Sequence, residues 1–185
     1  MDDEHPVTHP LVARVADYVD ACNRHDVDAV LGFYTTDVRF ELVGAWVRQG
    51  RDELRRLAEY DKGTNCVLSM VNPSVVASDT VEVELVDRND WFGLVGVDQV
   101  IFPSVTFRFR GDKISEVRVV MSEDGAAALS RASSRVMAWM REKYPGELAG
   151  LMPGGRRVYS AEAAAKWLRL LKEWREERPW GASRQ

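Results

Sequence analysis

Arg88 and Asp90, two residues apart, are the pair in this sequence best suited to acid–base chemistry. They lie in a run rich in strand-forming residues, 80–92, and residues two apart on a strand point to the same face. An arginine guanidinium that hydrogen-bonds a carboxylate keeps the carboxylate ionised or positions it to transfer a proton to or from a reacting oxygen. The alternative interpretation is an exposed ion pair near a strand end, which would contribute little stability.

Tyr18 is the second candidate catalytic residue. It lies on the apolar face of a predicted helix over 11–23. Its hydroxyl can donate to an oxygen that develops negative charge, although a core tyrosine with a satisfied hydroxyl is the more common outcome. Some aromatic side chains could also line a pocket for a flat apolar ligand, while most belong to the core; they are Trp46, Trp91, Phe92, Phe102, Phe107 and Phe109.

Composition and motifs argue against several classes of function. Cys22 and Cys66 lie far apart without C-x-x-C spacing, so neither a disulfide framework nor a thiolate metal site is expected. The sequence has no metal cluster, phosphate-binding glycine loop or nucleophile motif, and we expect no metal and no cofactor. The net charge of −4 argues against nucleic-acid binding. Without a long apolar run or a secretory signal, we expect a cytoplasmic protein with no membrane partner.

The elements that position these residues begin with helices. Apolar residues at three- and four-residue steps predict helices over 11–23 and 27–34, with Asp26 as the N-cap of the second. Alternating apolar residues predict a strand over 37–44. Helical periodicity returns over 51–62.

A meander of strands follows the helices, and this order indicates an α+β fold. The last two strands are joined by a hairpin turn at 110–113. Pro73 and Pro103 each remove a ladder donor, so we expect edges or bulges there that curve the sheet. The predicted strands cover residues 65–77, 80–92, 97–110 and 113–121.

The C-terminal region, 125–185, returns to helical periodicity with apolar tryptophan stripes on either side of a Pro/Gly loop at 145–155. Such stripes must be covered, by the outside of the sheet, over a pocket mouth or by a second subunit. We expect this extension to pack on the domain formed by 1–124 and, as a second expectation, to contribute to a homodimer.

Two segments carry a family resemblance, DYVDACNRHDVDAVLGFYTTDVRFELVGAWVRQGRDEL and VTFRFRGDKISEVRVV. Their order and spacing resemble the nuclear transport factor 2-like superfamily over about residues 10–122, specifically its SnoaL-like and ketosteroid-isomerase-like members. The resemblance implies a cone-shaped, curved antiparallel sheet wrapped around three N-terminal helices, with a largely apolar pocket. That superfamily includes isomerases, dehydratases, cyclases, epoxide hydrolases and binding or dimerisation modules, so the fold implies no single reaction.

Similarity to ketosteroid isomerase implies an oxyanion-donating role for Tyr18, which matches the tyrosine of that enzyme's first helix. The position of its base falls on Leu42, or on Glu41 with a one-residue gap. The position of its buried donor aspartate falls on Val105.

Similarity to limonene epoxide hydrolase lies at VDRNDWF. It implies that Arg88 and Asp90 take the places of that enzyme's Arg-x-Asp pair. The second carboxylate that the enzyme requires falls on Val119.

Three hypotheses follow. The first is a cofactor-independent enzyme that acts on a small, mostly apolar molecule by acid–base hydrolysis, isomerisation or dehydration, in which Arg88 orients Asp90 and Tyr18 donates a hydrogen bond. The second is a non-catalytic ligand-binding module, and the third is a dimerisation module with a vestigial pocket. The expected ligand contacts are Leu42, Trp46, Trp91, Phe92, Val105 and Phe107.

Overall fold

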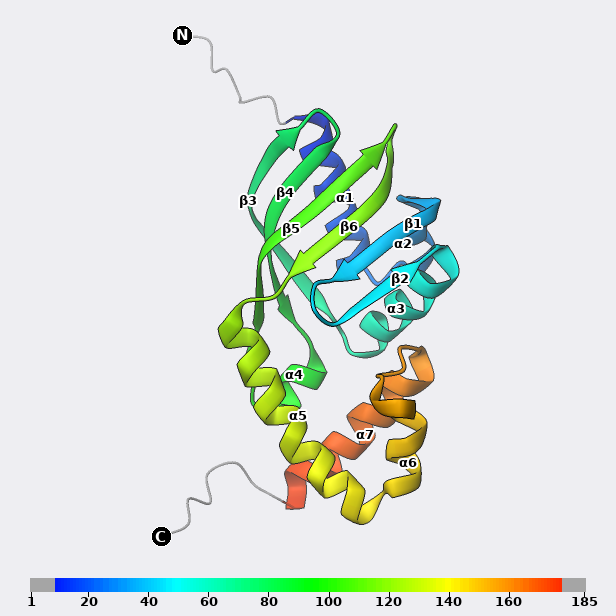
Figure 1. Cartoon of the computed structure of the whole chain (residues 1–185), viewed down its shortest axis with the longest axis vertical. Coiled ribbons are helices and arrows are strands. Elements are labelled where there is room, and N and C mark those ends of the chain that lie inside the picture. The colour runs from blue at the N-terminus through cyan, green and yellow to red at the C-terminus, as the bar shows by residue number, and fades with distance from the viewer. Residues whose placement is uncertain (1–8, 178–185) are drawn as a thin grey trace.

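The computed structural model describes residues 9–177. It contains a curved, unclosed six-stranded sheet with three helices against it and a layer of helices beyond one end (Figure 1). The three helices are α1 (Pro10–Asn23), α2 (Val27–Gly32) and α3 (Arg51–Gly63). The Asp26 side chain accepts a hydrogen bond from the Ala29 amide at 3.0 Å, which confirms it as the N-cap of α2.

The strand order in the sheet is β2-β1-β6-β5-β4-β3. Neighbouring strands are antiparallel except β1 and β6, which run parallel. The prediction of an antiparallel sheet needs this one correction, because no hairpin joins these two strands and fixes their relative direction. The strands are β1 (Tyr34–Leu42), β2 (Trp46–Gln49), β3 (Val67–Ala77), β4 (Thr80–Arg88), β5 (Val100–Arg110) and β6 (Lys113–Val120).

The predicted irregularities at the two strand prolines are confirmed. The β3–β4 register shifts between Val71 and Ser74, on either side of Pro73. The β4–β5 register shifts where Phe102 and Val105 flank Pro103. Each shift interrupts the ladder and bends the strands. The sheet therefore wraps around α1, which packs against β3 and β4.

One predicted strand was too long, and the error matters for the site. Residues 80–92 were expected to be extended, but β4 ends at Arg88 and α4 (Asp90–Val95) begins two residues later. The Asn89 side chain caps this helix by accepting a hydrogen bond from the Phe92 amide at 2.9 Å. Arg88 and Asp90 therefore do not share one face of a strand.

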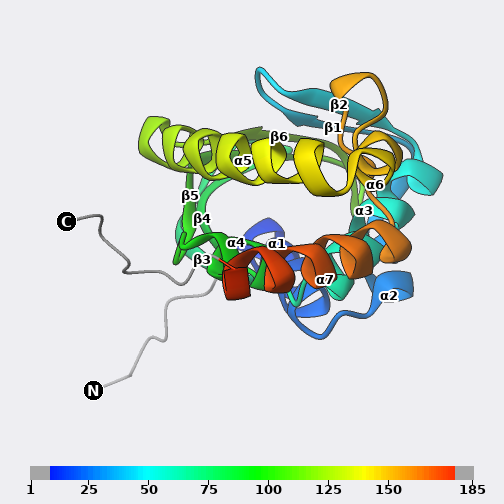
Figure 2. The same ribbon diagram turned by 90° about the horizontal axis from the view of Figure 1, so that it is seen from below.

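The C-terminal helices form a layer with its own apolar cluster. They are α5 (Glu123–Lys143), α6 (Pro145–Leu151), a 3-10 turn η1 (Pro153–Gly155) and α7 (Ala161–Glu177). The expected loop at 145–155 contains α6, because a proline is well accommodated at the first position of a helix. Figure 2 shows α5 and α7 on opposite sides of this end of the molecule. The cluster includes Tyr60, Trp91, Val95, Trp139, Trp167, Leu171 and Trp174.

No helix within residues 9–177 is long and apolar enough to cross a membrane.

Gly63 fixes the distance between α3 and α7. A Cβ atom at Gly63 would lie 2.6 Å from the Ala164 Cβ. We therefore expect Gly63→Ala to lower the free energy of unfolding by about 1–3 kcal/mol, because the two helices must separate. Urea denaturation measures the loss. Gly150→Ala, where an added Cβ meets nothing within 4 Å, is the matched control, and equal stabilities for the two variants would contradict the expectation.

Candidate functional site

A cavity of about 240 Å³ lies between the sheet, the N-terminal helices and the C-terminal layer. Most of its wall is apolar, with contributions from α1, α3 and the inward faces of the strands. The side chains expected to contact a ligand all line it, namely Leu42, Trp46, Trp91, Phe92, Val105 and Phe107. Their role in binding stays a prediction.

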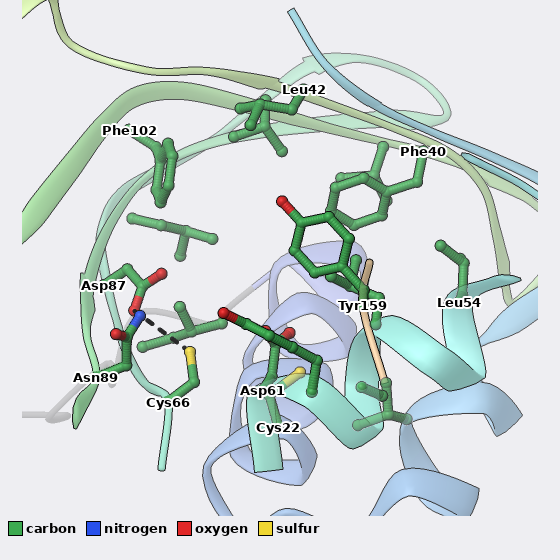
Figure 3. A pocket seen from close by; sticks show the side chains of 18 of the residues that line it. Cys22, Phe40, Leu42, Leu54, Asp61, Cys66, Asp87, Asn89, Phe102 and Tyr159 are labelled. Atoms are coloured by element: carbon green, nitrogen blue, oxygen red, sulfur yellow. Dashed lines mark hydrogen bonds between the residues drawn. The ribbon is translucent and has the colours of Figure 1, made fainter. Parts of the chain in front are cut away.

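Two carboxyl groups, Asp61 and Asp87, line this apolar cavity (Figure 3). Asp87 lies near the end of β4, in phase with the buried Val83 and Leu85, and the alternation of a strand turns all three inward. Asp61 lies near the end of α3, seven residues after the buried Leu54, so both residues share one helix face. The sheet and the helix thus present one carboxyl each to the same space.

The two carboxyl groups have different proton affinities. Burial, together with the nearby Asp87, raises the pKa of Asp61 to about 8. Burial raises the pKa of Asp87 to about 6. The Asp87 Oδ1 accepts hydrogen bonds from the Cys66 Sγ at 3.3 Å and the Asn89 Nδ2 at 3.2 Å, and both lower its pKa against the effect of burial. At neutral pH, Asp61 is therefore mainly a carboxylic acid and Asp87 mainly a carboxylate.

The thiols in the wall are not nucleophiles at neutral pH. Burial raises the pKa of Cys22 to about 12 and that of Cys66 well above its usual value. The thiolate is the reactive form, so both side chains remain thiols. Cys66 instead serves as a donor to Asp87. The backbone carbonyl of Cys66 contacts the Nε2 of His25 at 3.0 Å, which ties this segment to the corner after α1.

Tyr18 lines the cavity together with Tyr34. Their hydroxyl oxygens lie 2.6 Å apart in a buried hydrogen bond. Burial raises the pKa of both phenols, so both hydroxyls keep their protons. One hydroxyl must donate to the other, and the Tyr18 hydroxyl is also hydrogen-bonded to the Cys22 side chain. The structure thus places Tyr18 at the cavity, with its partner Tyr34 unforeseen from the sequence.

Tyr159 and Arg157, from the segment before α7, also line the cavity. The Tyr159 ring centroid lies 5.8 Å from that of Trp46 and 5.0 Å from that of Tyr60. The Arg157 guanidinium lies 4.4 Å from the Trp91 ring centroid. The C-terminal layer thus packs on its own chain and also completes the cavity wall.

Arg88 and Asp90 do not line the cavity. Both are exposed, and Arg88 donates a hydrogen bond to the Gln99 side chain. Their neighbours Asp87 and Asn89 line it instead. The signal that identifies Asp87 is the two-residue alternation of buried positions along β4, which predicts that residue 87 faces inward and residue 88 outward.

Among residues 9–177, no three or more His, Cys, Asp or Glu side chains gather in a way that could hold a metal ion.

Asn89 connects the site to α4, since its Oδ1 caps the helix while its Nδ2 donates to Asp87. We expect Asn89→Asp to keep the cap but raise the pKa of Asp87, because a second carboxylate replaces the donor. An NMR titration of the Asp87 carboxyl carbon measures the shift. Asn89→Ser, which also caps a helix but adds no charge, is the control. An unchanged or lower pKa in Asn89→Asp would contradict this account.

Comparisons with known proteins agree with this architecture. The family model for the SnoaL-like domain matches residues 15–117, more than half of the chain. The epoxide hydrolase/cyclase-like enzyme SalBIII, described in pyran ring formation in the polyether salinomycin, has a TM-score of 0.55 and 23% identity, covering 61% of this chain and 91% of its own. An LEH-like epoxide hydrolase from M. tuberculosis has a TM-score of 0.53 and 17% identity, covering 69% and 94%.

A de novo designed protein with a curved β-sheet has a TM-score of 0.51 and 15% identity, covering 69% of this chain and 98% of its own. At these identities the similarities show the fold alone. No curated protein matches the sequence significantly. The family match and the curved sheet around α1–α3 together establish that the chain belongs to the SnoaL-like domain family, with the nuclear transport factor 2-like fold.

Proposed function

We propose that the cavity is the active site of a cofactor-independent enzyme that performs acid–base chemistry on a small, mostly apolar molecule. The observation that carries this proposal is the pair of carboxyl groups in one apolar cavity, with pKa values of about 8 for Asp61 and about 6 for Asp87. Pairs of titratable groups whose surroundings separate their pKa values provide an acid and a base at one pH.

In the proposed mechanism, Asp87 is the base and Asp61 is the acid. In hydrolysis of an epoxide, the Asp87 carboxylate takes a proton from water as the water oxygen bonds to a ring carbon. The carbon–oxygen bond breaks, and Asp61 delivers its proton to the departing oxygen. In isomerisation of a β,γ-unsaturated ketone, Asp87 removes a proton next to the carbonyl while Asp61 protonates the carbonyl oxygen, which gives a dienol. Asp87 then delivers its proton to the γ carbon as Asp61 takes the proton back from the enol oxygen, so the double bond has moved and both groups are restored. After epoxide hydrolysis, proton exchange with water restores the two groups.

The surrounding side chains support the assignment of Asp87 as the base and Asp61 as the acid. Asn89 and Cys66 donate to Asp87 and favour its charged form. Within residues 9–177, no hydrogen bond is found to the Asp61 carboxyl, so its proton is available to a ligand. The Tyr18–Tyr34 pair is a further possible donor to a developing oxygen anion.

The family supports the reaction class. It includes isomerases, cyclases and epoxide hydrolases that work without cofactors. The epoxide hydrolase/cyclase-like enzyme SalBIII and the M. tuberculosis LEH-like epoxide hydrolase share the fold with this chain, and their activities favour epoxides as the first compounds to test.

The test is turnover of a panel of small apolar epoxides and β,γ-unsaturated ketones by the full chain. We expect at least one class to be converted by the wild type and not by the double variant Asp61→Asn/Asp87→Asn. Conversion that persists in the double variant would refute the assignment of these two residues.

A second function, ligand binding without catalysis, is favoured by the apolar wall at Leu42, Val105 and Val119. These are the positions where the resemblance places functional groups of catalytic relatives. If calorimetry shows that epoxides or ketones from the panel bind while none is converted at any pH between about 5 and 9, binding alone is the better description. That window spans the pKa values of both carboxyl groups.

A further inference from the structure

A second hollow, of about 750 Å³, lies beside the cavity. Its walls come from the turn and start of β2, from the first turns of α3 and from the segment 152–159 that precedes α7. Four arginines line it: Arg48, Arg56, Arg156 and Arg157. We call this hollow the arginine cleft.

The arginine cleft carries an excess of positive charge. Glu53 is the acidic side chain among its lining residues, and the Glu53 carboxylate accepts a hydrogen bond from the Gln49 amide at 2.9 Å. Across residues 9–177, no ion pair joins Arg48, Arg56 or Arg156 to a carboxylate. Several other surface arginines have carboxylate partners within 4 Å, namely Arg14, Arg39, Arg55, Arg108, Arg110 and Arg169. The exposed Arg88, Arg118, Arg131 and Arg141 have no ion pair within the described residues either, so the arginine cleft is distinguished by four arginines gathered in one hollow.

The arginine cleft and the cavity share a wall. Trp46, Arg157 and Tyr159 line both of them. The Arg48 guanidinium lies 5.3 Å from the Trp46 ring centroid and 5.4 Å from that of Tyr159. The two aromatic rings therefore have a guanidinium over them and also border the apolar space that contains Asp61 and Asp87. The positively charged arginine cleft and the apolar cavity with its carboxyl pair therefore adjoin at these side chains.

We propose that the arginine cleft binds the anionic head group, a phosphate or a carboxylate, of an amphipathic substrate whose apolar end enters the cavity. Arginine is suited to this role because its planar fork donates two parallel hydrogen bonds to either group. The proposal rests on the proposed role of the cavity and narrows the substrate class to small apolar molecules with one anionic end.

The test measures binding, so it does not depend on turnover. Isothermal titration calorimetry compares octyl phosphate, octanoate and neutral 1-octanol as ligands of the full chain. We expect at least one anion to bind about tenfold more tightly than octanol, and this preference to shrink as the salt concentration rises. The tighter of the two anions identifies the head group. Equal affinities for the anions and octanol, or no binding of either anion, would overturn the proposal.

Variants then locate the head group. We expect Arg56→Gln and Arg156→Gln each to weaken binding of the preferred anion about tenfold and to leave octanol binding unchanged. Arg131→Gln and Arg141→Gln are matched controls, because both residues are exposed on α5 and outside the arginine cleft and the cavity. Equal losses in the control variants, or no loss in the cleft variants, would also overturn the proposal.

The two proposals fail in different ways. If an anion binds selectively and the cleft variants lose it, but no compound is converted, the catalytic role of Asp61 and Asp87 is wrong and the anion site remains. If apolar compounds are converted but anions show no advantage, the anion site is wrong and the catalysis remains.

Discussion

Replacing Asp87 by asparagine is expected to lower kcat at pH 7 by about 10²- to 10⁴-fold, the range that a general base contributes. Asparagine has nearly the same shape and can still accept the hydrogen bonds that Cys66 and Asn89 give to Asp87. The fold should therefore survive while the proton acceptor is lost. The measurement is the initial rate on a substrate from the panel, with circular dichroism to confirm folding.

The pH dependence of kcat/KM is an independent test of the roles of Asp87 as base and Asp61 as acid. Activity should rise as Asp87 loses its proton near pH 6 and fall as Asp61 loses its proton near pH 8. Asp61→Asn should remove the upper limb and leave a low rate. The exposed Asp98 provides the control, and Asp98→Asn should behave as the wild type. A wild-type rate in Asp87→Asn would rule out Asp87 as the base.

Asp61→Asn is also expected to make the protein more stable, by several kcal/mol at pH 9. The folded pKa of Asp61, about 8, lies above its ordinary value of 3.8. Folding therefore binds a proton between these values, so the stability from Asp61 is fully present below about pH 4 and is lost as the pH rises to about 8. Each pKa unit corresponds to about 1.4 kcal/mol, and the neutral asparagine removes this loss.

Urea denaturation at pH 5, 7 and 9 measures this effect. The stability of the wild type should decrease across the series, and Asp61→Asn should flatten the decrease. Asp87 contributes a smaller loss that ends near pH 6, because its pKa is raised less. A parallel pH dependence in wild type and Asp61→Asn would show that Asp61 is solvated, which would also remove the basis for its role as an acid.

Local patterns in the sequence predict much of the fold. The helices α1 and α3, the cap at Asp26, the hairpin between β5 and β6 and the irregularities at the strand prolines all follow from periodicity, capping and proline chemistry. The parallel β1–β6 pair does not, because it pairs residues 77 to 80 positions apart that no turn connects.

The candidate site was predicted only in part, for a similar reason. The predicted alternation along β4 was off by one residue, so Arg88 was expected to face inward where Asp87 does. The strand was also expected to continue through Asn89, which instead caps α4. Asp61 was not among the predicted site residues, because its burial depends on the sheet and on the C-terminal layer that close around it. Long-range packing, which one sequence does not display, therefore decided which carboxyl groups became chemically distinctive.

The position of the cavity between two apolar clusters has a thermodynamic consequence for the described fold. A molecule in the cavity touches side chains from both apolar clusters, the one around the sheet and the one in the C-terminal layer. Separation of the two clusters would release the molecule, so its binding free energy adds to the free energy needed to separate them. We therefore expect the ligand-bound protein to unfold as one cooperative unit, because the bound ligand contacts both clusters.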